Sequence, residues 1–340
     1  MHIYIDPRDK ILYDSYYIQG LEDKYGSTHV HFSTCFFKDL NRKKSFSYDH
    51  YMAYVMKDDS NIVRVIVDYH DSVSVAEIAY EWCDVYAKIN IENKDVLYNH
   101  PKMVSIPPGF GIKIWSVSKT IRKCISNRLK CLFLENISSL KEFIYGYAVM
   151  ALKRKPLLFY LQESISPKDK YVFHTSTMWA NSDCQNKTNP IRASFIRACK
   201  VNTDIQYEGG LVCKWDNPPE YKDILSPRYK MEEYLLKTKQ SLFVFNTPAV
   251  LGCHGWKLGE YFAMGKAIIT TPLSNVLPFG FKDEDNCLIV RNEKEISEAI
   301  ERLVKDKTLI EKLEASSRYI YDNYSSPLQV INTINKKLGL

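Results

Sequence analysis

The sequence predicts an α/β fold with two domains, and three observations support this class. Short β-branched and aromatic runs alternate with helical patterns along both halves of the chain, which is typical of parallel sheets with crossover helices. The chain has 340 residues, too many for one small core. Hydrophobic residues make up 45% of it, enough to fill two cores. We therefore expect two doubly wound domains.

The first domain is expected to span residues 1–155 and to end near the basic run at 153–156. Strands are predicted at 2–6, 29–34 and 61–72. Residues 75–89 begin with apolar residues at helical spacing and end with a strand-like run. A Pro/Gly loop follows at 105–111. After this loop, apolar residues recur at three- and four-residue spacing, which predicts an amphipathic helix. They are Ile121, Cys124, Ile125, Leu129 and Leu132.

The second domain is expected to span residues 156–325 and to repeat the alternation. Its predicted strands are 157–161, 171–176, 204–210, 241–245, 266–270 and 287–290, and its predicted helices are 189–200, 228–240 and 293–324. Gly209 and Gly210 are expected to end the strand at 204–210. Residues 326–340 are expected to form a C-terminal helix that packs back on the first domain.

Cysteine usage and the N-terminal residues predict a cytoplasmic protein. The nine cysteines are odd in number and scattered, and they contain no Cys-x-x-Cys pair, which disfavours a disulfide framework and a zinc ribbon. The N-terminal residues lack the apolar core of a secretory signal. No apolar run approaches the roughly 20 residues that cross a bilayer.

Residues 118–155 form a basic segment with nine Lys or Arg residues and two Glu, whereas the whole chain has a formal charge of +6. Such a segment fits an anionic membrane surface or a phosphorylated acceptor, and the alternative is a solvated helix face. The apolar side that includes Ile121, Cys124, Ile125 and Leu129 is expected either to complete the core or to enter a lipid interface. The second option would place the protein peripherally on the inner face of the membrane.

Residues 251–272, "LGCHGWKLGEYFAMGKAIITTP", are the strongest candidate for a ligand site. In open α/β sheets, ligands gather where a strand ends and a helix begins, because the helix N-terminus offers free N–H groups. Glycines such as Gly255 allow close approach, His254 and Lys257 add donors for a diphosphate, and Glu260 can accept hydrogen bonds from a ribose. The alternative is a surface carboxylate and an ordinary loop histidine.

The order of elements from about 165 to 325 resembles the nucleotide-sugar-binding domain of GT-B glycosyltransferases, in which two Rossmann-like domains face a cleft. The resemblance rests on "IQYEGGLV", "EEYLLKTKQSLFVFNTP", "HGWKLGEYFAMGKAIITTP" and "DNCLIVRNEKEISEAIERLVKD", with "GEYFAMGKAII" its most specific part. It implies that Glu260 binds the ribose and that His254 and Gly255 belong to the diphosphate loop. Exostosin-like enzymes have a similar turn, so the subfamily stays open.

One departure from this family concerns stereochemistry. Many retaining members carry a first glutamate eight positions before the ribose glutamate, and Gly252 stands at that position here. An inverting mechanism with a base from the first domain therefore stays open, as does retention.

Further donor-site candidates lie near the start of the second domain. Ser176 and Thr177 follow a predicted strand and are candidates to donate to phosphate. Arg192 and Arg197 lie five apart on one helix, so one of them should face the ligand, and Arg192 is nearer the helix N-terminus. Tyr207 is a candidate to stack on the base. Ordinary turn and surface roles are the alternatives.

Candidate catalytic residues lie at the ends of two predicted strands of the first domain. His70 and Asp71 lie at the end of a strand with a buried centre, and a histidine near a carboxylate can take a proton from a sugar hydroxyl. Asp6 ends the first strand and is a second candidate, although strand-end Asp and His are also common caps. No P-loop, G-x-G-x-x-G, H-E-x-x-H or G-x-S-x-G motif is present, and we expect no metal requirement.

The expected function is transfer of a hexosyl or deoxyhexosyl group from a nucleoside-diphosphate sugar to a hydroxyl of a glycan or lipid-linked acceptor. Synthesis of a surface polysaccharide or glycan is the expected setting. The donor sugar is a substrate, so no further cofactor is expected, and no nucleic acid partner. Two alternatives stay open: a nucleotide-sugar epimerase of the same fold, and a non-catalytic protein that binds polyanions or lipid through residues 118–155.

Overall fold

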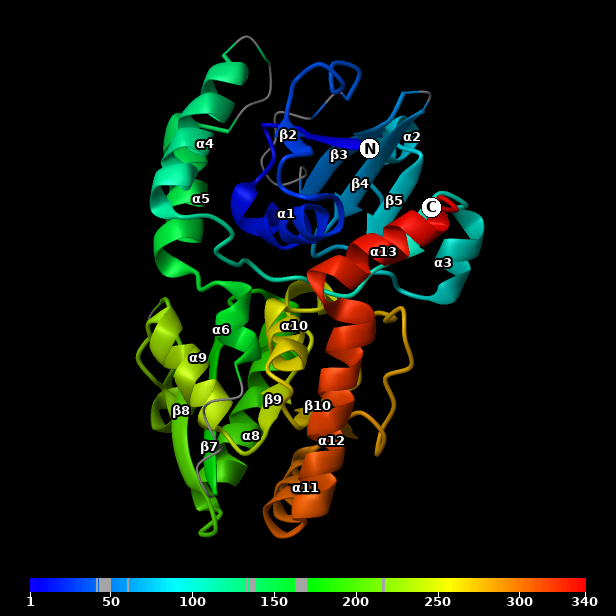
Figure 1. The fold of residues 1–340 in the computed structure, drawn as a ribbon. Helices are drawn as coiled ribbons and strands as arrows, with labels where there is room; N and C mark the ends of the chain where they lie inside the picture. Colours follow the sequence, from blue (N-terminus) through cyan, green and yellow to red (C-terminus); the bar gives the residue numbers. More distant parts are fainter. Residues whose placement is uncertain are drawn as a thin grey trace. The chain divides into compact units, whose positions relative to one another are not determined.

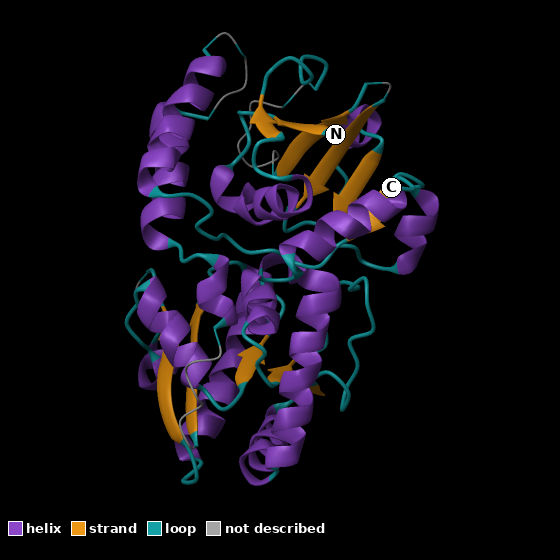
Figure 2. Ribbon diagram, in the orientation of Figure 1, coloured by secondary structure: helices purple, strands orange, loops and turns teal. Residues whose placement is uncertain are grey.

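The computed structural model describes residues 1–40, 42, 50–59, 61–132, 134, 138–162, 170–215 and 218–340 (Figure 1). The chain forms two compact units. Unit 1 contains Met1–Leu157, Asn275–Pro278 and Asp322–Leu340, and unit 2 contains Leu158–Ser274 and Phe279–Tyr321. Both units combine parallel strands with helices (Figure 2), so the predicted α/β class is confirmed. The cleft expected between two domains stays a prediction.

Unit 1 is built on a six-stranded sheet in the order β2-β1-β3-β4-β5-β6. Its strands are β1 (His2–Ile5), β2 (Val30–Phe32), β3 (Tyr51–Lys57), β4 (Ile62–Asp68), β5 (Val85–Lys88) and β6 (Met103–Ser105). β3 runs antiparallel to both β1 and β4, and the other neighbours are parallel. The antiparallel strand β3 was not among the predicted strands. Its sequence, YMAYVMK, is apolar on both faces and therefore lacks the alternation that marks a half-exposed strand.

Helices cover both faces of this sheet. They are α1 (Ile11–Tyr25), α2 (Glu77–Trp82), α3 (Lys94–Asn99), α4 (Val117–Lys130), α5 (Leu140–Lys153) and α13 (Pro327–Lys337). The apolar cluster that includes Ala53, Val55 and Tyr86 packs under α2. α1 and α13 lie side by side (Figure 1), and Gly20 is required there, because a Cβ atom on it would lie 2.2 Å from the carbonyl oxygen of Pro327.

Unit 2 contains two groups of parallel strands. The first is β7 (Tyr171–Thr177) with β8 (Gln206–Val212), and the second is β9 (Val244–Asn246), β10 (Ile268–Thr270) and β11 (Leu288–Ile289). The amide of Leu242 donates to the carbonyl of Tyr171 at 2.7 Å, which places the chain that enters β9 beside β7. The strand order is therefore β8-β7-β9-β10-β11.

The helices of unit 2 are α6 (Leu157–Leu161), α7 (Ser182–Asn186), α8 (Thr188–Val201), α9 (Met231–Gln240), α10 (Trp256–Ala263), α11 (Glu293–Lys305) and α12 (Lys307–Ile320). α8 and α11 pack together against the sheet. The rings of Phe195 on α8 and Phe245 on β9 stack with centroids 4.2 Å apart, which fixes α8 over the sheet.

Three local predictions were wrong. The single helix expected at 293–324 is divided into α11 and α12 at Asp306, whose backbone is extended (φ −113°, ψ 91°). Residues 157–161 form helix α6 and not a strand. A run of five apolar residues is too short to show whether its hydrophobic period is that of a helix or of a strand. In this helix Tyr160 is buried and Leu158 is exposed. β8 also continues through Gly209 and Gly210 and does not end at them. A Cβ atom on Gly209 would lie 1.9 Å from the carbonyl oxygen of His174, so Gly209 lets β8 approach β7 closely. A Cβ atom on Gly210 would lie 2.3 Å from the carbonyl oxygen of Ile224, so Gly210 allows a second close backbone contact.

Candidate functional site

The strand order of unit 2 reverses direction between β7 and β9. The chain moves from β7 outward to β8, and then returns to the other side of β7 to form β9, β10 and β11. In open α/β sheets, ligands bind at the carboxyl ends of the strands where the order reverses. The residues at this point are Thr175, Ser176 and Thr177 at the end of β7, and Asn246 and Thr247 at the end of β9.

Arg192 on α8 joins these two strand ends. Its side chain is buried; its Nε donates to Thr247 Oγ1 at 2.8 Å, and its Nη1 donates to the carbonyl of Thr177 at 2.8 Å. Burial lowers the pKa of Arg192 to about 10, so the guanidinium remains charged at neutral pH. Arg197 lies on the outer side of the same helix and pairs with Asp223 at 2.9 Å. The five-residue spacing therefore separates the two arginines as expected.

Lys257, the second residue of α10, provides a second positive charge at the end of β7. The residue is half-buried, but its ammonium is enclosed: it donates to the carbonyl of Thr175 and lies 5.6 Å from the ring centroid of Tyr234. Burial and repulsion from Arg192 lower the pKa of Lys257 to about 7, against the attraction of Glu260. A nearby anion would therefore raise this pKa and be bound by the charged form.

Glu260 lies one turn further along α10 and is 3% exposed. Its Oε2 accepts a hydrogen bond from the hydroxyl of Tyr234 at 2.9 Å. Burial and the Glu260 charge raise the pKa of Tyr234, so this hydroxyl stays protonated and keeps donating. A ribose diol at Glu260 would compete with Tyr234 for the carboxylate.

Two polar atoms at the end of β7 are buried without a hydrogen-bond partner among the residues that the structure describes, His174 Nδ1 and Thr175 Oγ1. His174 is 3% exposed, and its Nε2 lies 3.1 Å from Ser176 Oγ. Burial, followed by repulsion from Lys257 and Arg192, lowers its pKa well below the ordinary value, so the ring is neutral. Buried polar atoms are normally paired, so these two mark a polar position that a ligand or water can fill.

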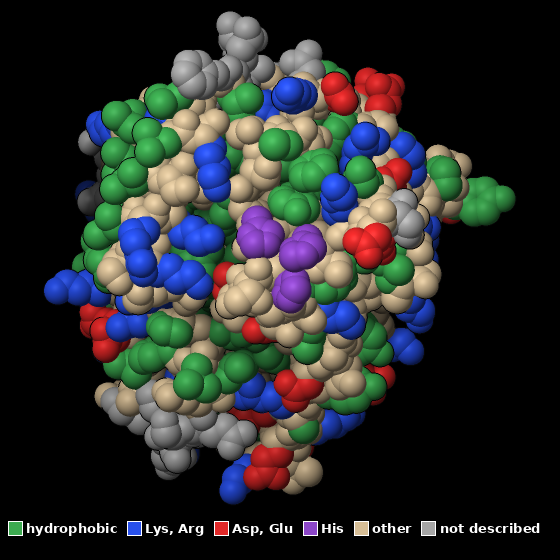
Figure 3. Space-filling view, turned by 45° about the horizontal axis from the view of Figure 1, so that its top comes forward, with side chains coloured by type: hydrophobic (Ala, Val, Ile, Leu, Met, Phe, Trp, Pro, Cys, Tyr) green, Lys and Arg blue, Asp and Glu red, His purple; other side chains and the backbone are tan. Residues whose placement is uncertain are grey.

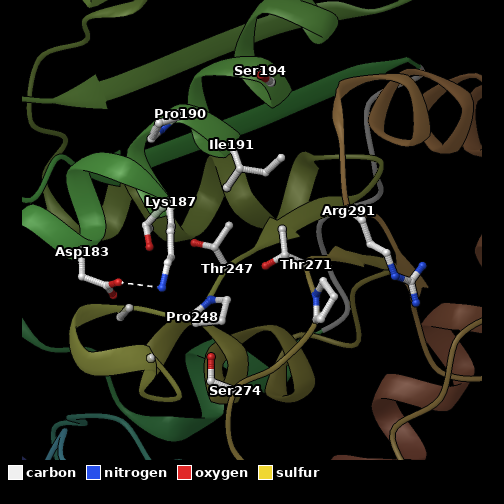
Figure 4. A pocket seen from close by; sticks show the side chains of 14 residues that line it. Asp183, Lys187, Pro190, Ile191, Ser194, Thr247, Pro248, Thr271, Ser274 and Arg291 are labelled. Carbon is white, nitrogen blue, oxygen red and sulfur yellow. Dashed lines mark ion pairs between the residues drawn. The ribbon is translucent and has the colours of Figure 1, made fainter.

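A pocket of about 430 Å³ opens at the carboxyl ends of β9 and β10, beside the first turn of α8 (Figure 4). Thr247 and Thr271 follow neighbouring strands and lie side by side in it. Its lining is rich in hydroxyl groups and prolines, and it includes the ion pair of Asp183 and Lys187 at 2.9 Å. The lining residues are Asp183, Lys187, Thr188, Pro190, Ile191, Ser194, Thr247, Pro248, Ala249, Gly252, Thr271, Pro272, Ser274 and Arg291.

None of the side chains predicted for the donor site is among the residues that line this pocket. Thr247 connects the two, because it faces the pocket and also accepts from Arg192. Gly252, the position of the missing glutamate, lines the pocket with φ +72°, and a Cβ atom there would lie 3.0 Å from Ser274. The pocket residues were missed by sequence reasoning, although Thr-Pro directly after two strands, at 247–248 and 271–272, was an available signal.

The remaining predicted donor residues have varied surroundings. His254 is buried, and Gly255 is the N-cap of α10. Thr177 contributes its carbonyl to Arg192. Tyr207 is half-buried, packs against the core of unit 2 and donates to the carbonyl of His174 at 3.3 Å; its stacking on a base stays a prediction.

The catalytic candidates of unit 1 are held by local contacts. Asp6 is buried; burial opposes its ionisation, but Arg42 and Arg8 outweigh it, and the pKa of Asp6 lies below its ordinary value. Nδ1 of His70 accepts from the amide of Ser72 at 3.1 Å, so in the neutral ring the proton is on Nε2, which can donate but not accept. Asp71 is exposed. Their roles as bases stay predictions.

No group of three or more His, Cys, Asp or Glu side chains is arranged to hold a metal ion within the described ranges. No helix in the part of the chain that the structure describes is long and apolar enough to cross a membrane.

The chain is similar to several solved structures. One is the C-terminal domain of a group 1 family glycosyl transferase from Francisella tularensis, at 13% identity and a TM-score of 0.32, covering 48% of this chain and 90% of that one. The Anabaena protein HepE in complex with UDP-glucose matches at 10% identity and a TM-score of 0.43, covering 77% and 65%. The pneumococcal O-GlcNAc transferase GtfA in complex with UDP and GlcNAc matches at 11% and 0.40, covering 85% and 70%.

No protein-family model and no curated protein sequence matches this chain. At these identities and TM-scores, the structural similarities do not assign an activity to this chain. An activity has to be inferred from the residues of unit 2.

Proposed function

We propose that the protein is a glycosyltransferase that binds a nucleoside-diphosphate sugar in unit 2 and transfers the sugar to an acceptor hydroxyl. The main support for the proposal is a pair of enclosed cations, Arg192 and Lys257, at the carboxyl ends of β7 and β9. Glu260 is the carboxylate that attracts Lys257 there. A diphosphate at this point would compensate the excess positive charge.

The diphosphate is the leaving group of the proposed reaction, and its charge grows as the bond to the sugar breaks. Arg192 and the protonated form of Lys257 would stabilise that charge, as would the N–H groups at the N-terminus of α10. The hydroxyl-rich pocket beside Thr247 has the chemistry to hold a sugar, because sugars are recognised by paired donors and acceptors. Glu260 and Tyr234 form the proposed ribose contact.

The finer parts of the proposal follow the resemblance. The acceptor is a hydroxyl of a glycan or a lipid-linked carrier in the synthesis of a surface polysaccharide or glycan, and the group transferred is a hexose or deoxyhexose. The reaction needs no metal ion, because side-chain cations take over the leaving-group charge. His70, Asp71 and Asp6 remain the proposed sources of a base, and His70 would first have to release the amide of Ser72.

A ligand screen by thermal shift tests the proposal. A nucleoside diphosphate at 100 times its Kd should add about 2.7 kcal/mol to the free energy of unfolding. Lys257→Gln should lose this shift, whereas Arg197→Gln, a change of a cation on the outer face of α8, should keep it. The proposal fails if no nucleoside diphosphate or nucleotide sugar stabilises the protein. Release of free sugar without transfer to any acceptor would instead favour a hydrolytic or epimerising reaction.

A further inference from the structure

Helices α4 and α5 pack against each other at one side of unit 1. Asn127 on α4 donates to the hydroxyl of Tyr147 on α5 at 2.8 Å, and the guanidinium of Arg128 lies 5.8 Å from the ring centroid of Phe143. Phe143, Tyr147 and Asn127 are buried. These contacts define the inner side of the helix pair and leave the other side to solvent.

Each helix carries a row of apolar side chains on that outer side. Side chains four residues apart share one face of a helix, so the row on α4 is continuous, whereas the row on α5 is interrupted by Ala148 between its second and third members. On α4 the row is 41–58% exposed, and on α5 it is 49–70% exposed. We call the two rows together the hairpin face; it consists of Val117, Ile121, Ile125 and Leu129 on α4 and of Leu140, Ile144 and Leu152 on α5.

The hairpin face shows that the apolar side of α4 does not complete the core. Of the residues expected there, Cys124 is half-buried, whereas Ile121, Ile125 and Leu129 face solvent. Hydrophobic side chains gather at the left edge of Figure 3, where α4 and α5 lie. An exposed apolar surface of this length on a folded unit marks a site of interaction.

Basic side chains border both rows. Arg122 follows Ile121 on α4, Lys141 follows Leu140 on α5, and both are exposed. Tyr145 is 60% exposed and lies under the ammonium of Lys153, 5.8 Å from the ring centroid. Glu142 is the acidic residue in the described part of 118–155, and it is engaged in the capping box with Ser139. The border of the hairpin face is therefore positive.

We propose that the hairpin face docks on a membrane surface that contains anionic lipids. The apolar rows would enter the boundary between headgroups and acyl chains, and the basic border would lie at the negative headgroups. Tyr145 has the amphipathic side chain that is favoured at such an interface. A protein partner would need an acidic rim around its apolar patch, whereas an anionic leaflet supplies both features in one surface. This inference does not depend on the proposed transferase activity.

Co-sedimentation with vesicles tests the proposal on the full chain. We expect binding to vesicles of phosphatidylcholine mixed with phosphatidylserine, much weaker binding to phosphatidylcholine alone, and loss of most binding at high salt. Arg122→Glu combined with Lys141→Glu should weaken binding to the anionic vesicles by at least about tenfold. Lys294→Glu combined with Lys305→Glu, an equal change of charge at two exposed sites of unit 2, should leave binding unchanged.

A second pair of variants tests the apolar rows. Ile125→Asp and Ile144→Asp alter exposed side chains, so both should fold and should abolish binding to the anionic vesicles. Val201→Asp is the matched control, because Val201 is 78% exposed on α8 in unit 2. Thermal melting and the shift with nucleoside diphosphates should stay unchanged in all three variants, which separates this proposal from the nucleotide site.

Three outcomes would overturn membrane docking. The wild-type protein could bind neither kind of vesicle at low salt. Ile125→Asp could bind anionic vesicles as well as wild type does. The wild-type protein could instead self-associate in sedimentation velocity, with Ile125→Asp monomeric and vesicle binding absent, which would identify the hairpin face as a contact between copies of the chain.

Discussion

Nε of Arg192 donates to Oγ1 of Thr247 at 2.8 Å and so ties the start of α8 to the loop that follows β9. The same Thr247 lines the pocket, which means that the hydroxyl group of one residue connects the buried cation with the open cavity. A ligand that contacts this hydroxyl group would therefore be linked to the buried charge of Arg192 through one hydrogen bond.

Replacing this hydroxyl should destabilise unit 2. Thr247→Val removes the acceptor and leaves Nε of the buried Arg192 without a partner, which should cost about 1–3 kcal/mol in the free energy of unfolding by urea. Thr271→Val, the same change at the end of the neighbouring strand β10, should cost less, because no hydrogen bond to Arg192 is lost there. Equal losses in the two variants would show that the Arg192 contact contributes nothing specific.

Lys257 should make stability depend on pH. Its pKa is about 7 in the folded protein and near the ordinary lysine value of 10.5 when the chain is unfolded, so between these pH values the unfolded chain binds more protons. The free energy of unfolding of wild type, relative to Lys257→Gln, should therefore rise as pH increases from about 7 to about 10. Urea titrations of both proteins at several pH values measure this, and parallel pH profiles would contradict it.

Loss of the proton from Lys257 should weaken donor binding, although it increases the stability of the protein. A diphosphate prefers the charged form of Lys257, so the Kd of a nucleoside diphosphate should increase as pH rises above about 7. Calorimetry across this range checks the slope. Lys257→Arg, whose charge persists, should flatten it; a slope unchanged in Lys257→Arg would assign the effect to another group.

Glu260→Gln should weaken donor binding while the fold is kept. Loss of a charged acceptor for the ribose hydroxyls should cost about 1.5–3 kcal/mol in donor affinity, measured by calorimetry. The glutamine retains an oxygen that can accept from Tyr234, so the melting temperature should change little. Glu298→Gln, at an exposed site on α11, is the control. An unchanged Kd would remove Glu260 from the site.

Gly209→Ala should be among the most destabilising small substitutions. A Cβ atom would lie 1.9 Å from the carbonyl oxygen of His174, and the φ of +114° is strained for any side chain. We expect a loss of about 2–5 kcal/mol in the free energy of unfolding. Gly26→Ala also has a positive φ, +85°, but its new methyl group would lie 3.8 Å from its nearest neighbour, a ring carbon of His29, so this variant tests the backbone strain without the clash. Similar losses in both would show that β8 can shift.

Much of the fold could be predicted from the sequence, because its helices and parallel strands alternate regularly and are separated by clear caps. Asn292 and Pro327 stand at helix starts where such residues are expected. β3 could not be predicted in this way, because its residues are buried on both faces and so show no alternation of apolar and polar residues. The glycines of β8 were misread because a strand end and a close approach of two backbones require the same residue type.

The candidate site was predicted in part. The turn before α10 and Arg192 could be located, because a helix that follows a strand directs its N-terminus at the carboxyl edge of the sheet. The hydrogen-bond partner of Glu260 could not, since Tyr234 lies on another helix and is distant in sequence. The pocket forms because Thr247 and Thr271, which follow two different strands, lie side by side. The order of strands in the sheet determines this position, and the local sequence does not reveal that order.

The division of the chain between the units has a consequence for synthesis. Unit 1 begins at Met1 but includes α13, whose residue Pro327 closes on Gly20 of α1. Chains emerge from the ribosome N-terminus first, at about 5–20 residues per second, and domains generally fold as units. All of unit 2 has been translated before α13 exists. Unit 1 therefore stays incomplete, with the surface of α1 that α13 will cover still open, until unit 2 has been translated.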